Sequence, residues 1–207
     1  MIKQFEEISH FPCGAFLSPD QECLWRVWAP SSRELKIVLI DDQQQRSVHR
    51  MTGTGDGYFV FEAGLILEGQ QYLFPLDSGR ELPDPVSRWQ PDGVDAPSAV
   101  WNPDSFEWTD HEWRGVQREN LVFYELHVGT FSPHQSFAGI LPRLRQLREL
   151  GVTAIQLMPV AQFSGRRSWG YDGMYWYAVQ NTYGGPRELQ HLVNACHRAG
   201  FRDHQLR

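Results

Sequence analysis

The sequence has few cysteines, no long hydrophobic run and no excess of positive charge. Three cysteines stand among 207 residues, and their odd number and scattered positions match neither a disulfide framework nor a zinc site. We therefore expect reduced thiols, a cytoplasmic location and no bound metal. No apolar stretch approaches the roughly 20 residues of a membrane-spanning helix. The first residues lack the apolar core of a signal peptide, so we expect no membrane association.

The net charge of -6 argues against a nucleic-acid partner, because such partners favour a basic surface. One basic cluster, RLRQLR at 143–148, lies near the end of a predicted helix, where cations complement the helix dipole. Aromatic residues are abundant, with eight Trp, twelve Phe and seven Tyr. They serve either to fill cores or to stack on sugar rings, and composition alone does not separate the two uses.

Residues 1–80 are predicted to form an immunoglobulin-like β-sandwich. Short apolar runs alternate there with turn signals, and no helical period interrupts them. The runs are CLWRVWA (23–29), LKIVLI (35–40), RSVHRM (46–51), YFVFEA (58–63) and QYLFPL (71–76). The first run carries polar and apolar residues on both faces, so its core side is left open.

Residues 81–118 are rich in proline and tryptophan. Proline interrupts ladders and helices, whereas tryptophan side chains need a surface to pack on. We therefore expect an ordered connector between two domains. The residues concerned are Pro83, Pro85, Pro91, Pro97, Pro103, Trp89, Trp101, Trp108 and Trp113.

Residues 119–207 are predicted to fold as strand, helix, strand, helix. The strands are expected at 121–128 and 152–159, with helices at 136–150 and 186–199. Parallel neighbours need such a crossover between them, and an aromatic, glycine-rich loop follows the second strand. FRDHQLR at 201–207 has no apolar alternation, so we expect no third strand. A closed (β/α)8 barrel takes about 250 residues, and this segment corresponds to about a third of one.

Four motifs, in order, resemble the α-amylase superfamily, glycoside hydrolase family 13. They are YELHVGTF (124–131), LMPV (157–160), GRRSWGYDG (165–173) and YGGP (183–186). RVWAP at 26–30 resembles the start of the carbohydrate-binding-module-like sandwich that precedes many such barrels. The resemblance implies the first two β/α units of a TIM (β/α)8 barrel, truncated, behind the sandwich.

The motifs are most similar to the branch that hydrolyses the α-1,4 bond next to the terminal trehalosyl unit of maltooligosyltrehalose. The implied partner is maltooligosyltrehalose or another α-glucan, and no cofactor is implied. A retaining glycosidase needs a nucleophile and a general acid about 5–5.5 Å apart. The family takes both from later strands, and its third-strand motif is replaced here by FRDHQLR. We therefore assign no catalytic residue and expect the chain alone to be inactive.

Four residues are the candidates for substrate binding: Tyr171, Asp172, Trp169 and His127. Tyr171 matches the family tyrosine that stacks beneath the sugar, and Trp169 and Asp172 belong to the same loop. Three structural interpretations stay open: Tyr171 as a core residue, Asp172 as a brace of the loop, and His127 as a hydrogen-bonded core histidine. Arg166 and Arg167 either contact substrate hydroxyls or are solvated.

Two other functions stay open for the chain. It is either a non-catalytic α-glucan-binding module, in which the aromatic residues of the sandwich hold the glycan, or a fragment of a glycogen branching or debranching enzyme. The GYDG loop and the PDPVSRWQPDGV connector favour the trehalose-releasing branch over these enzymes.

Overall fold

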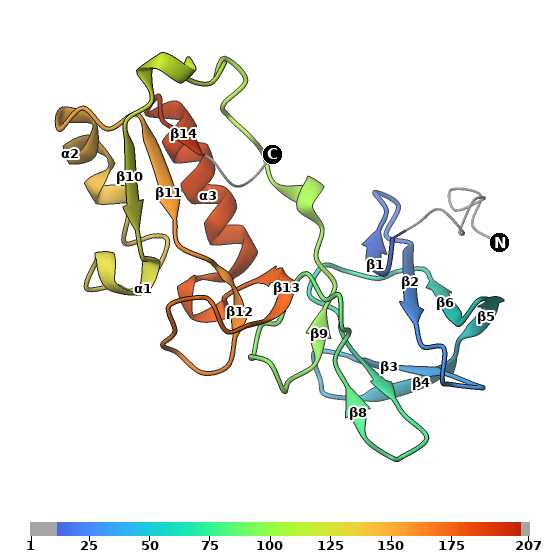
Figure 1. Cartoon of the computed structure of the whole chain (residues 1–207). Coiled ribbons are helices and arrows are strands. Elements are labelled where there is room, and N and C mark those ends of the chain that lie inside the picture. The colour runs from blue at the N-terminus through green and yellow to red at the C-terminus, as the bar shows by residue number, and fades with distance from the viewer. Residues whose placement is uncertain (1–11, 204–207) are drawn as a thin grey trace. The chain divides into compact units, whose positions relative to one another are not determined.

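The computed structural model describes residues 12–203. The chain forms two compact units, residues 1–103 and 104–207, and the elements of each are labelled in Figure 1. The division falls inside the segment 81–118 that the sequence marks as a connector. Each unit is described here by itself.

The first unit contains two antiparallel sheets. One has the strand order β1-β2-β6-β5, and the other has the order β4-β3-β7-β8, with β9 also paired to β7. The strands of the first sheet are β1 (Gly14–Leu17), β2 (Cys23–Trp28), β6 (Tyr58–Ala63) and β5 (Thr52–Gly55). Those of the second are β4 (Arg46–Arg50), β3 (Lys36–Ile40), β7 (Gln71–Pro75), β8 (Glu81–Leu82) and β9 (Ser98–Ala99).

The five strands predicted between residues 23 and 76 are all present. Side chains from both sheets join one buried core, in which the rings of Trp25 and Tyr72 meet edge to face at 5.9 Å. The prediction missed β1 and β5 because their sequences, GAFL and TGTG, are short and rich in glycine. In β2, the side that carries Trp25 and Val27 faces this core. Arg26, on the other side, is also buried, with its guanidinium 3.8 Å from the centre of the Tyr58 ring.

The first part of the proline-rich segment packs into the first unit. β8 and β9 both pair with β7, and Trp89 and Trp101 contact each other edge to face at 5.7 Å. Asp84 is fully buried there and accepts hydrogen bonds from the Tyr72 hydroxyl at 2.8 Å and the Val86 backbone N–H at 3.0 Å. This part of the segment is therefore ordered by sheet pairing and by burial.

The second unit is built on a parallel sheet with the order β10-β11-β14, visible on edge in Figure 1. β10 spans Phe123–Leu126, β11 spans Ala154–Leu157 and β14 spans Arg202–Asp203. The expectation of no third strand was wrong, since β14 pairs in parallel with β11. Backbone groups make this pairing whatever the side chains, and the fully buried Phe201 anchors the strand at its start.

Helices cover the sheet face that carries Leu126 and Ile155. They are α2 (Leu144–Glu149) and α3 (Gly185–Arg198), with a short α1 (Val128–Phe131) directly after β10. The 3-10 helices are η3 (Pro103–Ser105), η4 (Arg118–Asn120), η5 (Leu141–Arg143) and η6 (Asn181–Tyr183). Within residues 12–203, none of the helices combines the length and the apolar character that crossing a bilayer requires.

Two helical predictions fared differently. α3 begins as expected, with Pro186 in its first turn and Gly200 in a left-handed conformation just past its end. The helix expected over 136–150 is shorter, because Pro142 lacks the N–H that continues an α-helix and sits in η5 instead. The helix α2 therefore begins at Leu144 rather than at residue 136.

The second part of the proline-rich segment packs against α3. The ring of Trp113 stacks on His197 at 3.7 Å, and its indole N–H donates to the Phe201 carbonyl at 2.8 Å. His197 Nδ1 lies 2.5 Å from Asp110 Oδ2, and both side chains are buried. The tryptophan thus finds the packing surface that the sequence led us to expect.

The aromatic loop after β11 contains a hairpin that the sequence did not predict. β12 (Ala161–Phe163) pairs antiparallel with β13 (Gly173–Val179), with irregular register. Residues 164–172, called here the substrate loop, connect the two strands. The hairpin was missed because its strands are irregular and enclose nine residues rather than a tight turn.

Burial of Asp84 gives the first unit a pH-dependent stability. Desolvation raises the pKa of this carboxyl from 3.8 to about 6, although hydrogen bonds from Val86 and Tyr72 and the charge of Arg88 act against the rise. Because the folded pKa lies above the unfolded one, ionisation opposes folding. The stability is fully present below about pH 4 and falls as the pH rises through about 6.

We predict that Asp84→Asn removes this dependence. Relative to the variant, the original protein should lose on the order of 3 kcal/mol of unfolding free energy between about pH 4 and pH 7, from a shift of about two pKa units. Hydrogen exchange of β7 amides in rising urea measures the difference. If the difference in unfolding free energy between the original protein and Asp84→Asn were the same at about pH 4 and about pH 7, the prediction would be contradicted.

Candidate functional site

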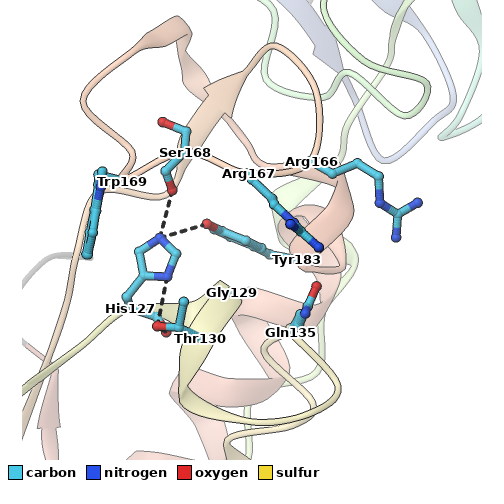
Figure 2. Close-up of a pocket in the computed structure, with 9 residues that line it drawn as sticks. All are labelled: His127, Gly129, Thr130, Gln135, Arg166, Arg167, Ser168, Trp169 and Tyr183. Carbon is cyan, nitrogen blue, oxygen red and sulfur yellow. Dashed lines mark hydrogen bonds between the residues drawn. The ribbon is translucent and has the colours of Figure 1, made fainter.

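A cavity of about 410 Å³ opens beside the ends of β10 and β12. Figure 2 shows the nine residues that line it: His127, Gly129, Thr130, Gln135, Arg166, Arg167, Ser168, Trp169 and Tyr183. They come from the end of β10, from α1 and the loop that follows it, from the substrate loop and from η6. The carboxyl ends of parallel strands are where α/β folds place ligands, and β10 ends at this cavity.

His127 lies at the centre of the cavity wall. Its Nε2 lies 2.8 Å from the carbonyl oxygen of Ser168, and a carbonyl only accepts hydrogen bonds. Nε2 therefore carries a hydrogen and donates it. Nδ1 lies 3.2 Å from Thr130 Oγ1 and accepts its hydroxyl hydrogen. Figure 2 shows both contacts. The imidazole therefore joins β10 and α1 to the substrate loop.

Trp169 forms the aromatic side of the cavity. Its indole meets the His127 ring edge to face at a centroid distance of 5.7 Å, and 68% of the residue surface is exposed. The ring is therefore fixed on one edge and open to a ligand elsewhere. Of the four residues predicted from the sequence, the structure brings these two, His127 and Trp169, together in one cavity.

Tyr171 and Asp172 lie in the same loop but do not line the cavity. Tyr171 is 70% exposed, so it is not a core residue. Asp172 Oδ2 accepts a hydrogen bond from the Ser168 hydroxyl at 3.3 Å, and the same hydroxyl accepts from the Gly170 N–H at 3.0 Å. Asp172 thus braces the loop, and its role toward substrate stays a prediction.

Sequence reasoning missed Gln135 and Tyr183 as cavity residues. Tyr183 stands inside the YGGP motif, so a signal for it existed; its hydroxyl lies 3.3 Å from His127 Nε2. Burial raises the pKa of Tyr183, which keeps the phenol neutral. Gln135 has a left-handed backbone (φ 53°) in a loop, and no sequence pattern marks it.

The cavity surface is mostly apolar, with polar side chains but no acidic one among the residues that line it. Its two charged residues, Arg166 and Arg167, are exposed, and in Figure 2 the Arg167 side chain points toward Gln135. No aspartate or glutamate lines it. Residues 12–203 contain no group of three or more His, Cys, Asp or Glu side chains placed to hold a metal ion. The site therefore offers donors, hydroxyls and an aromatic face.

The path of the substrate loop depends on Gly170. Its φ of +92° favours glycine, and a Cβ atom there would lie 2.2 Å from the Pro159 carbonyl oxygen. The loop therefore packs directly on the backbone that follows β11. Gly165, at the other end, also has a positive φ (+77°), but a Cβ atom would meet nothing within 4 Å.

Residues 102–202 match the family model of the α-amylase catalytic domain. This segment of the chain therefore belongs to the α-amylase family. The chain is 46% identical over 177 residues to the malto-oligosyltrehalose trehalohydrolase of Saccharolobus solfataricus, and 42% identical to that of Deinococcus radiodurans. Each match covers 86% of this chain, which spans only about 30% of the length of these relatives. A 1,4-α-glucan branching enzyme of Geobacillus stearothermophilus is less similar, at 28% identity.

Solved structures give the same family. A Salmonella typhimurium protein provisionally assigned as an α-amylase superposes with a TM-score of 0.86 at 37% identity, over 92% of this chain and 32% of that one. A pullulanase from Anoxybacillus, solved in complex with maltotetraose, superposes with a TM-score of 0.77 over 98% of this chain and 36% of its own. At 21% identity, the pullulanase match shows the fold alone.

We predict that Gly170→Ala disorders the substrate loop whereas Gly165→Ala does not. Both variants place alanine at a positive φ, which costs about 1–2 kcal/mol, but only the first collides with backbone. Trypsin cleavage after Arg166 and Arg167, mapped by mass spectrometry, should be at least about tenfold faster in Gly170→Ala than in Gly165→Ala. That ratio corresponds to about 1.4 kcal/mol less free energy needed to open the loop. Equal cleavage of the two variants would show that the Pro159 contact does not hold the loop.

Proposed function

We propose that the second unit binds an α-glucan as part of a trehalose-releasing glycoside hydrolase. The observation that carries the proposal is the cavity itself, which an aromatic ring (Trp169), a hydroxyl (Thr130), an amide (Gln135) and a guanidinium (Arg167) line together. A pyranose presents an apolar face and a rim of hydroxyls, and this combination complements both. The similarity to malto-oligosyltrehalose trehalohydrolases supports maltooligosyltrehalose as the substrate.

Within this proposal, β10, β11 and β14 are the first strands of a TIM (β/α)8 barrel. Their parallel order and the helices over one face agree with that architecture. The two antiparallel sheets of the first unit correspond to an immunoglobulin-like, carbohydrate-binding-module-like domain. These assignments place the cavity at the end of the barrel where such enzymes bind substrate.

The proposal gives this chain a binding role rather than a bond-cleaving one. Retaining hydrolysis needs a nucleophilic carboxylate and a carboxylic acid about 5–5.5 Å apart, on either side of the scissile bond. No acidic residue lines the cavity. The Glu125 carboxylate accepts a hydrogen bond from Gln156 at 3.4 Å, and Asp172 braces the substrate loop. We assign neither of them to a catalytic pair.

We predict that the purified chain is retarded by glycogen in affinity electrophoresis and that Trp169→Ala weakens this binding about tenfold. Truncating a central tryptophan contact commonly costs more than about 1 kcal/mol. Trp176→Ala is the matched control, since this residue of β13 is 71% exposed and does not line the cavity; it should change affinity less than about twofold. Unretarded migration of the original protein would refute the proposal.

We also predict that the chain releases no trehalose from maltooligosyltrehalose. The physical reason is the missing pair of carboxylates at the cavity. The measurement is product analysis by anion-exchange chromatography after long incubation, with a trehalohydrolase of full length as the positive control. Turnover that survives repeated purification and disappears in Asp172→Asn would show that the chain holds its own catalytic group.

A further inference from the structure

Gln180 connects the substrate loop to the wall of the cavity without touching the cavity. It follows β13 directly and is fully buried. Its side-chain oxygen accepts from the Phe163 N–H at 2.9 Å, at the start of the loop. Its amide nitrogen lies 3.2 Å from the carbonyl oxygen of Gly165 and 2.9 Å from the Thr182 hydroxyl. One side chain therefore ties the start of the loop to the segment that follows β13.

The backbone of the same residue holds the next part of the site. The Gln180 N–H donates to the Val160 carbonyl at 2.8 Å, and its carbonyl accepts from the N–H groups of Tyr183 and Gly185, both at 3.2 Å. Tyr183 lines the cavity, and its ring contacts Phe163 edge to face at 5.7 Å. Both the side chain and the backbone of Gln180 thus bear on segments that form the cavity.

We propose that Gln180 is a positioning residue, which sets the path of Arg166 and Arg167 through the Gly165 carbonyl and fixes that path relative to Tyr183. Gly165 directly precedes Arg166, so a hydrogen bond to its carbonyl determines where the two arginines enter the cavity wall. Glycine has no side chain to restrict its own backbone, so the restriction comes from outside. The relevance to α-glucan binding rests on the proposed function, whereas the positioning itself does not.

An amide is the group this position requires. The side chain must accept one backbone hydrogen bond and donate others at the same time, which a carboxylate does not do. All groups within hydrogen-bond reach of the side chain are uncharged: the Phe163 N–H, the Gly165 carbonyl, the Asn181 amide oxygen and the Thr182 hydroxyl. A carboxylate placed there would therefore be buried without a cation and would face the Gly165 carbonyl.

The decisive variant is Gln180→Glu, examined by hydrogen exchange with mass spectrometry in the free protein. At pH 7.5 the introduced carboxylate leaves the Gly165 carbonyl without a donor, a loss of about 1–3 kcal/mol. Amides of residues 164–172 should exchange at least about tenfold faster than in the original protein. At pH 5 the carboxyl is protonated because burial favours the neutral form, so its O–H can donate to Gly165 and the ratio should fall below about threefold.

Two further variants separate positioning from general destabilisation. Gln180→Ala should expose the loop equally at both pH values, because it has no proton to gain. Gln90→Glu buries a carboxyl at a fully buried glutamine of the first unit, whose amide donates to the Gly93 and Ala96 carbonyls; it should leave exchange of residues 164–172 unchanged. Thr182→Val removes only the nearest acceptor and should give a smaller increase, confined to the loop.

The outcomes distinguish this inference from the proposed function. Unchanged loop exchange in Gln180→Glu, or an equal increase in the peptides of β11, would overturn the positioning role. Maltoheptaose added to the original protein should slow exchange of residues 164–172 at least about twofold. A ligand concentration equal to the dissociation constant is enough to produce that ratio. Absence of that protection would refute α-glucan binding, while the comparison of free variants would still decide the role of Gln180.

Discussion

His127 donates a hydrogen bond across 2.8 Å to the carbonyl oxygen of Ser168, and this contact joins the end of β10 to a loop 41 residues later in the chain. Its effect extends on both sides of the imidazole. The hydroxyl of Thr130, in α1, lies within hydrogen-bond distance of the imidazole Nδ1. The indole ring of Trp169 contacts the imidazole edge to face. The parallel sheet brings the end of β10 near the substrate loop, and the hydrogen bond between His127 and Ser168 connects the two at the cavity wall.

The fold was readable from sequence wherever side-chain pattern determines it. The runs around Trp25 and Tyr72 became strands of a shared core, and Pro186 marked the start of α3. β14 was missed because two residues of backbone pairing need no apolar alternation. The helix predicted over 136–150 was wrong in its first part. The spacing of apolar residues favours a helix there, but Pro142 lacks the N–H that an α-helix needs and lies in η5 instead.

The candidate site, like the fold, was predicted from the sequence only in part. His127 and Trp169 stand in motifs that indicate a binding site, and the structure places both at the cavity. Gln135 and Gln180 carry no such mark, because a glutamine in a loop or at a strand end gains its role only from distant backbone groups. Besides its neighbours Asn181 and Thr182, Gln180 receives its backbone partners on the loop side from positions 17 and 15 residues earlier. Local sequence does not encode that distance, so only the folded chain shows it.

The buried polar groups around the cavity differ in kind from those elsewhere in the chain. In the first unit, a buried carboxyl, Asp84, is held by a tyrosine hydroxyl, and at α3 an aspartate pairs with His197. Around the substrate loop, the amide of the fully buried Gln180 makes such contacts with the Phe163 N–H and the Thr182 hydroxyl.

Dipoles of this kind hold a loop without creating a strong local charge. A neutral sugar, the ligand of the proposed function, gains from a loop that is already ordered, because ordering on binding costs about 0.5–1.5 kcal/mol for each immobilised side chain. The hydrogen bonds of Gln180 and of His127 therefore meet the same requirement under the proposed function: they order this wall of the cavity before a ligand binds.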